Sequence, residues 1–218
     1  MLSRRNVNLA AGMATAIALT AGAIITSTGT AVADEAAAPA IGETAPAFTG
    51  TNSNGEEISL SDFDGKTVVL EWTNADCPFV KKHYDESVKN MQSLQTGAAE
   101  DEVVWISVIS SAPGKQGHVD GVTANELTTS RGAAPAHVII DETGEIGRAY
   151  DAKTTPHMFV IEGDQSLAYM GAIDSKKSAN PADIADSTNY VTAALESVAT
   201  GADVETTSTK PYGCSVKY

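Results

Sequence analysis

The chain has 218 residues, of which 42% are hydrophobic and 19% are charged, and its formal net charge at pH 7 is −14. Its length and apolar content are those of a globular protein with one sizeable core, and they favour a single domain. The acidic balance argues against a nucleic-acid or anionic-lipid partner, because both would require a basic surface. We interpret the charge as a contribution to solubility.

The first residues predict an export signal. Arg4 and Arg5 precede a weakly apolar stretch at 9–25, and Ala31-Val32-Ala33 offers the small residues that a signal peptidase recognises. A membrane anchor is disfavoured because Gly, Thr and Ala dilute the apolar stretch. We expect cleavage of residues 1–33 and export to the periplasm, with no membrane partner afterwards. The paired arginines fit twin-arginine export, although an ordinary secretory signal can carry them too.

The next segments predict a leader and the first elements of a domain over residues 46–201. Residues 34–45 are rich in Ala and Pro and are interpreted as a flexible leader. Asn54-Gly55 predicts the turn of a hairpin. The run KTVVLEW at 66–72 predicts a strand buried on both faces. Apolar residues at helical spacing over 80–94 then predict one helix.

Strands and helices alternate along the rest of the domain. This order predicts an α/β fold, in which helices cover both faces of one central mixed sheet. A polar tail, residues 202–218, carries the second of the two cysteines, Cys214. The expected strands are 102–110, 136–141, 157–162 and 166–173, and the expected helices are 122–130, 144–150 and a last one that ends at Gly201.

Cys77 stands where the strand at 66–72 gives way to a helix. Open α/β sheets bind their ligands at the carboxyl ends of strands. Pro78 suits the first helical position, so the thiol is expected near a helix N-terminus, where the dipole favours a thiolate. We therefore predict that the pKa of the Cys77 thiol is lowered and that its sulfur is reactive and solvent-accessible. Lys81 and Lys82 either add positive potential there or are simply solvated.

A second motif is Thr155-Pro156, directly before the strand at 157–162. Because proline cannot donate to a sheet ladder, its place there predicts a cis peptide bond, with an ordinary trans turn as the alternative. Trp72 either forms an aromatic wall beside the sulfur or belongs to the core. The four histidines show no metal-ligand spacing, so we expect no metal and no cofactor.

These stretches resemble the thioredoxin superfamily, and within it the redoxins, which include the alkyl hydroperoxide reductase and thiol-specific antioxidant (peroxiredoxin-like) proteins. The resemblance lies in residues 42–84, 138–175 and the ending TKPYGCSVKY at 209–218. It implies a thioredoxin-like fold with Cys77 as the nucleophile and Thr155 and Pro156 facing it. In that role, the backbone before the proline pairs with the substrate.

The sequence also departs from these families. Asn74 and Val80 occupy the positions where a thioredoxin would have the second cysteine of a Cys-x-x-Cys motif. Asn74 also stands where a typical peroxiredoxin has a threonine that polarises the peroxide. Thr73 is a candidate substitute for that hydroxyl, and Arg148 for the guanidinium of the family. The predicted substrate-binding residues are Trp72, Asn74, Thr155 and Pro156.

Without a neighbouring cysteine, Cys77 needs a remote thiol for turnover, and we predict Cys214 as its resolving partner. The expected function is an exported thiol oxidoreductase, monomeric or homodimeric, that reduces a hydroperoxide or exchanges disulfides with a protein. A thiol reductant protein would then restore it. The alternative is a non-catalytic thioredoxin-fold binding protein, in which the two cysteines form a structural disulfide or stay inert. A metallochaperone is a weaker third hypothesis.

Overall fold

The computed structural model describes residues 38–218. The predicted signal peptide, residues 1–33, and the start of the predicted leader lie outside this range. No helix within the described range is both long and apolar enough to cross a membrane.

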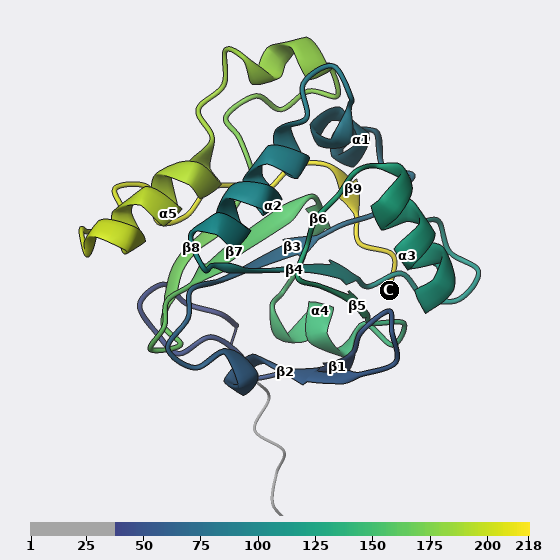
Figure 1. The fold of residues 1–218 in the computed structure, drawn as a ribbon, viewed down its shortest axis with the longest axis horizontal. Coiled ribbons are helices and arrows are strands. Elements are labelled where there is room, and N and C mark those ends of the chain that lie inside the picture. The colour runs from purple at the N-terminus through teal and green to yellow at the C-terminus, as the bar shows by residue number, and fades with distance from the viewer. Residues whose placement is uncertain (1–37) are drawn as a thin grey trace, which may run out of the picture. The chain divides into compact units, whose positions relative to one another are not determined.

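The centre of the fold is a five-stranded mixed sheet (Figure 1). Its strands, in spatial order, are β5 (His137–Ile140), β4 (Val104–Ile109), β3 (Val68–Trp72), β7 (His157–Ile161) and β8 (Leu167–Gly171). The first three run parallel, whereas β7 is antiparallel to β3 and β8 is antiparallel to β7. The prediction of a mixed sheet is confirmed, with each strand within two residues of its expected bounds.

Both faces of the sheet are covered. One face carries α4 (Glu145–Ala149) and a hairpin of β1 (Thr49–Thr51) and β2 (Glu57–Ser59), followed by the 3₁₀ turn η1 (Leu60–Phe63). On the other face pack four helices, as Figure 1 shows. These are α1 (Pro78–Tyr84), α2 (Asn90–Glu100), α3 (Gly121–Ser130) and α5 (Tyr190–Thr200). A second 3₁₀ turn, η2 (Pro181–Ile184), precedes α5.

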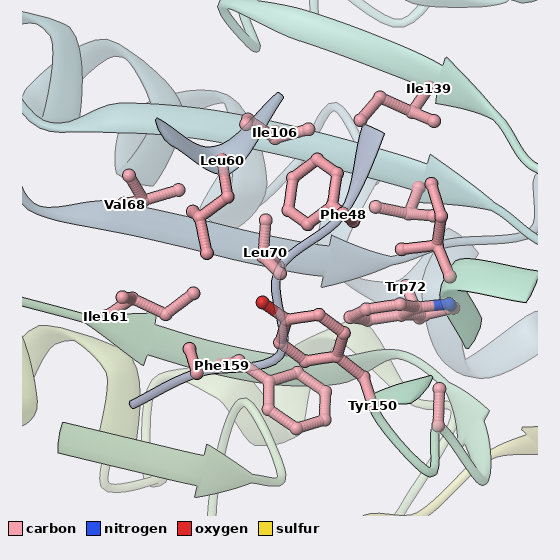
Figure 2. Packing of buried hydrophobic residues seen from close by; sticks show 14 of the residues in the cluster. Phe48, Leu60, Val68, Leu70, Trp72, Ile106, Ile139, Tyr150, Phe159 and Ile161 are labelled. Atoms are coloured by element: carbon pink, nitrogen blue, oxygen red, sulfur yellow. The ribbon is translucent and has the colours of Figure 1, made fainter. Parts of the chain in front are cut away.

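Strand β3 supplies side chains to both cores, as its unbroken apolar run predicted. Val68, Leu70 and Trp72 point into the core beneath α4 and the hairpin (Figure 2). Val69 belongs to the opposite core, beneath α1, α2 and α5. Because successive side chains alternate across a strand, β3 is buried on both faces and holds the site that follows it in a fixed position.

The single helix expected over 80–94 is wrong, because the structure has two helices with a turn between them. Asp85 leaves the helical conformation, and its carboxylate accepts a hydrogen bond from the Ser87 backbone N–H at 2.9 Å. Lys89 then adopts a left-handed conformation with φ 46°. A side chain that satisfies nearby backbone groups competes with helix continuation, and apolar spacing does not reveal this. Cys77 is therefore followed by a separate, short helix.

Backbone hydrogen bonds connect the polar tail to the domain at several points along its length. Thr209 donates its backbone N–H to Met170 at 3.1 Å, and Ala112 donates its N–H to the Lys217 carbonyl at 2.8 Å. Between these contacts, β9 (Cys214–Ser215) pairs with β6 (Thr154–Thr155) in a two-stranded antiparallel sheet. The tail therefore reaches the site as a strap that is fixed to the domain on both sides of Cys214.

Candidate active site

Cys77 is the residue that caps α1, directly after the turn that leaves β3. Pro78 begins the helix, and the Val80 and Lys81 N–H groups both bond to the Cys77 carbonyl. In its protonated form the thiol donates a hydrogen bond to the Thr155 carbonyl at 3.1 Å. The Cys77 side chain has 0% exposure. The expectation of a solvent-accessible sulfur is therefore wrong for this arrangement.

Cys214 lies beside this buried sulfur. It stands opposite Thr155 in the β6–β9 pair and packs, partly buried, against the core cluster that contains Cys77. Both cysteines are free thiols. The Thr155–Pro156 peptide bond is cis. The structure thus brings together four of the predicted site residues, namely Cys77, Cys214, Thr155 and Pro156.

The two thiols have opposite pKa shifts. Burial raises the pKa of Cys77, but hydrogen bonds from the Cys214 and Thr155 side chains and from the Cys214 and Val80 backbones outweigh it, and the pKa falls below its ordinary value. Burial, the hydrogen bond to Cys77 and the negative charge of its thiolate raise the pKa of Cys214 to about 11. Hydrogen bonds to the charged form stabilise it, so Cys77 is the thiol that ionises first, and Cys214 keeps its proton to higher pH.

The Thr155 hydroxyl contributes to this difference. It is buried and has no oxygen or nitrogen partner within the described range. A buried hydroxyl without a partner is costly, and an ionised sulfur is a stronger acceptor for it than a neutral thiol, which accepts only weakly. Thr155 therefore favours the thiolate through its side chain.

Asn74 organises the turn between β3 and α1. Its carboxamide oxygen accepts the Asp76 N–H at 2.9 Å, and its NH₂ group donates to the Gln116 carbonyl at 3.2 Å. Its backbone carbonyl accepts the Cys77 N–H at 3.0 Å. Gly117 lies so close that a Cβ there would fall 2.3 Å from the Asn74 side chain. With both ends of the amide occupied, Asn74 orients the nucleophile and holds the 111–119 loop.

Trp72 is a core residue, so the prediction that it contacts substrate is wrong. Its side chain has 0% exposure and lies in the cluster on the face of the sheet opposite Cys77. The indole lies beside the Tyr150 ring (Figure 2). The two ring centroids are 5.3 Å apart. Its ring N–H donates to the Ser110 hydroxyl at 3.0 Å. The side-chain alternation along β3 places Trp72 away from the sulfur.

Arg148 and Thr73 are not placed as the family pattern suggested. The Arg148 guanidinium donates to the Thr143 carbonyl and stacks over the Tyr218 ring at 4.6 Å from its centroid. It has no hydrogen bond to Cys77 within the described range. Thr73 is buried, and its hydroxyl has no partner there either. Neither side chain contributes to the pKa shift of Cys77.

A buried ionic cluster behind the site was missed by the sequence analysis. Lys82 is 1% exposed, so the expectation of a solvated lysine is wrong. Its ammonium donates to Asp174 at 2.8 Å, to the Lys176 carbonyl at 2.9 Å and to the Tyr212 hydroxyl at 3.3 Å. The Tyr212 hydroxyl in turn donates to the other Asp174 oxygen. The lysine is 92 and 130 residues from these side-chain partners, so no local spacing could have revealed the cluster.

Two buried histidines flank the region. Burial lowers the pKa of His83 and of His157 to about 4, so both rings are neutral at pH 7. Within residues 38–218, no three His, Cys, Asp or Glu side chains are grouped so that they could hold a metal ion. The chemistry available at the site is that of the two thiols.

The fold and the paired thiols define a thioredoxin-like redox protein. The chain belongs to the AhpC/TSA family, whose model matches residues 41–170. Membership in this redoxin family supports a thiol oxidoreductase. No curated protein matches the chain.

Several solved structures share the fold. An uncharacterized conserved protein from Geobacillus kaustophilus is 25% identical, with a TM-score of 0.67 over 82% of this chain and 92% of that one. A hypothetical protein from Sinorhizobium meliloti 1021 is 22% identical, with a TM-score of 0.67 over 84% of this chain and 96% of that one. A candidate protein disulfide isomerase from Bacteroides thetaiotaomicron is 16% identical, with a TM-score of 0.52 over 74% and 91%. The thioredoxin-like fold is confirmed.

Proposed function

We propose that this protein is an exported thiol peroxidase, in which Cys77 attacks a hydroperoxide and Cys214 resolves the oxidised sulfur. The observation that carries the proposal is the meeting of two free thiols at Thr155, one with a lowered and one with a raised pKa. A structural disulfide would need neither shift. A binding protein would not need the two sulfurs to meet.

The first step is attack of the Cys77 thiolate on the terminal oxygen of a hydroperoxide. The O–O bond breaks, Cys77 becomes a sulfenic acid, and the alcohol or water leaves after taking a proton. In the second step Cys214 attacks the sulfenic sulfur, a Cys77–Cys214 disulfide forms, and water leaves. A dithiol protein then reduces this disulfide, and its own two thiols become the oxidised pair.

The order of the steps follows from the charges. Burial raises the pKa of Cys214, and the hydrogen bond to Cys77 and the negative charge of its thiolate raise it further, so the second thiol stays protonated and unreactive. Conversion of Cys77 to a neutral sulfenic acid removes that charge. Cys214 then ionises more easily and becomes a better nucleophile at the moment when it is needed.

A hydroperoxide fits the site better than a protein disulfide. In the thioredoxin-like redoxins the backbone before the cis-proline pairs with a peptide substrate, and here the Thr155 backbone already pairs with Cys214. A peptide would have to displace β9, and the resolving thiol would leave with it. A small hydroperoxide requires only a local opening above Cys77.

The test uses the chain from residue 34 with Cys77→Ser and Cys214→Ser variants. Consumption of hydrogen peroxide and of an organic hydroperoxide is followed with a dithiol reductant, and reduction of a protein disulfide is measured separately. We expect Cys77→Ser to abolish peroxide turnover. In a parallel assay without reductant, Cys214→Ser should consume one equivalent of peroxide and keep a sulfenic acid on Cys77. Equal peroxide consumption by wild type and Cys77→Ser would refute the peroxidase. If neither substrate reacts with Cys77, the binding-protein alternative takes its place.

Export is tested separately, by fractionation of cells that express the full chain and by sequencing of the mature N-terminus. We expect periplasmic protein that begins at Asp34. Protein retained in the cytoplasm with Met1 intact would remove this part of the proposal.

A further inference from the structure

The buried cluster of Lys82, Asp174 and Tyr212, here called the tail latch, touches the tail two residues before Cys214. We propose that the tail latch positions Cys214 for its attack on oxidised Cys77 and thereby protects Cys77 from over-oxidation. This inference rests on the proposed function, because it assigns a positioning role within the resolution step.

The latch connects three segments of the chain, namely α1, the segment after β8 and the tail. Lys82 lies on α1, the helix that Cys77 caps. Asp174 follows β8, and its carboxylate also accepts the Lys176 backbone N–H at 3.0 Å. Tyr212 belongs to the tail, and its ring meets the Phe79 ring of α1 edge-on at 5.8 Å. The helix that carries the nucleophile and the strap that carries its partner are thus tied to one carboxylate.

The connection from Tyr212 to Cys214 passes through one tightly packed residue. Gly213 has φ 138°, and a Cβ at this position would lie 2.0 Å from the Thr155 carbonyl oxygen. Only glycine permits that approach. Cys214 follows immediately and pairs with Thr155. Cys214 is only two residues after Tyr212, so hydrogen bonds that fix the Tyr212 hydroxyl also fix the position of the Cys214 thiol.

A buried ion pair is a specific choice for such an anchor. Apolar packing of similar volume would stabilise the fold equally well or better, so the pair is not explained by stability alone. Hydrogen bonds require particular distances and directions, and every ammonium proton of Lys82 has an acceptor within 3.3 Å. The latch therefore specifies one placement of the tail.

That placement decides between two fates of the Cys77 sulfenic acid. Attack by Cys214 gives the disulfide and water, whereas attack of the sulfenic acid on a second hydroperoxide gives a sulfinic acid and an alcohol or water. The ratio depends on how often the Cys214 sulfur is held within reach. Loosening the latch should slow the first route and, because the strap covers Cys77, also expose the sulfur to the second.

The experiment compares Tyr212→Phe with Tyr218→Phe. Each removes one hydroxyl from a tail tyrosine, but the Tyr218 hydroxyl bonds to the Ala152 carbonyl and lies outside the latch. After an excess of hydrogen peroxide is added without reductant, samples are quenched over time and the Cys77 sulfenate, disulfide and sulfinate are measured by mass spectrometry. We expect disulfide formation to be about tenfold slower in Tyr212→Phe, as loss of the two hydrogen bonds of its hydroxyl allows, and nearly unchanged in Tyr218→Phe.

A second readout separates positioning from a general loss of structure. In the Cys214→Ser background, Tyr212→Phe should increase the rate at which iodoacetamide alkylates Cys77, because the strap opens more often. Phe79→Leu removes the ring contact but leaves the ion pair. It should slow disulfide formation and, in the Cys214→Ser background, speed Cys77 alkylation, each to a smaller extent than Tyr212→Phe. Unfolding curves identify any variant that is simply unfolded.

Equal disulfide formation and equal sulfinate yield in wild type and Tyr212→Phe would overturn the inference while leaving the proposed function intact. A wild-type protein that forms no sulfenic acid and no Cys77–Cys214 disulfide would instead refute the proposed function. Equal slowing in Tyr212→Phe and Tyr218→Phe would also overturn the inference, because the effect would then belong to the tail as a whole.

Discussion

Cys214 stands directly opposite Thr155 in the β6–β9 pair, and Thr155 is also the residue whose carbonyl accepts the hydrogen bond of the Cys77 thiol. Thr155 therefore contacts both cysteines. Its backbone sets the position of the second cysteine and contacts the first, and its hydroxyl is available to the thiolate. This arrangement links the acidity of Cys77 to the presence of the tail.

The first prediction concerns the titration of Cys77. Its alkylation rate by iodoacetamide should rise with pH around a midpoint below 9, since hydrogen bonds lower its pKa despite burial. Cys214→Ala removes a donor to the thiolate, so the midpoint should move to higher pH. Thr155→Val should move it in the same direction. The measurement follows the Cys77 peptide by mass spectrometry between pH 6 and 10, and an unchanged midpoint in both variants would contradict the assigned cause.

Gly213→Ala should displace the strap. An alanine Cβ would fall 2.0 Å from the Thr155 carbonyl oxygen, and φ 138° is unfavourable for any residue with a side chain. We expect disulfide formation between Cys77 and Cys214 to be lost or strongly slowed, while Cys77 becomes more accessible to alkylation. Gly201→Ala is the matched control, because Gly201 also has positive φ (67°) but no atom lies within 4 Å of its Cβ position. Comparable disulfide yields in the two variants would show that β9 is not held at this point.

Sequence patterns predicted the strands of the sheet and most of the covering helices because each depends on local apolar spacing, but they missed the turn that separates α1 from α2. They also predicted Cys77 at a strand–helix junction, since Pro78 and the preceding apolar run are adjacent to it. The same patterns failed where contacts between residues far apart in the sequence determine the structure. Lysine side chains are usually solvated, and Lys82 is buried because its ammonium pairs with a carboxylate 92 residues away. The tail lacks periodicity because pairing with β6 and single contacts hold it, not a packed face.

The buried histidines predict a loss of stability in mild acid. Because burial lowers the pKa of His83 and His157 to about 4 from 6.5, the unfolded chain binds protons that the folded chain does not as pH falls. Stability is therefore lost between pH 7 and 5.5, by about 1 kcal/mol for each histidine. Urea unfolding at the two pH values measures the loss. His157→Gln should reduce it by about half, and an equal loss in the variant would exclude His157 as a source.

The last prediction separates the stability of the tail latch from its geometry. Lys82→Met leaves the buried Asp174 carboxylate without its cation, which should lower the free energy of unfolding by about 3–5 kcal/mol. The double variant Lys82→Met, Asp174→Leu removes both charges and replaces them with apolar side chains, so most of that loss should be recovered. Urea unfolding of both variants checks this. Tyr212 nevertheless has no carboxylate to bond in the double variant, so disulfide formation should remain slow although the protein is stable. If the recovery of stability also restored wild-type disulfide formation, bulk packing and not the directed hydrogen bonds would place Cys214.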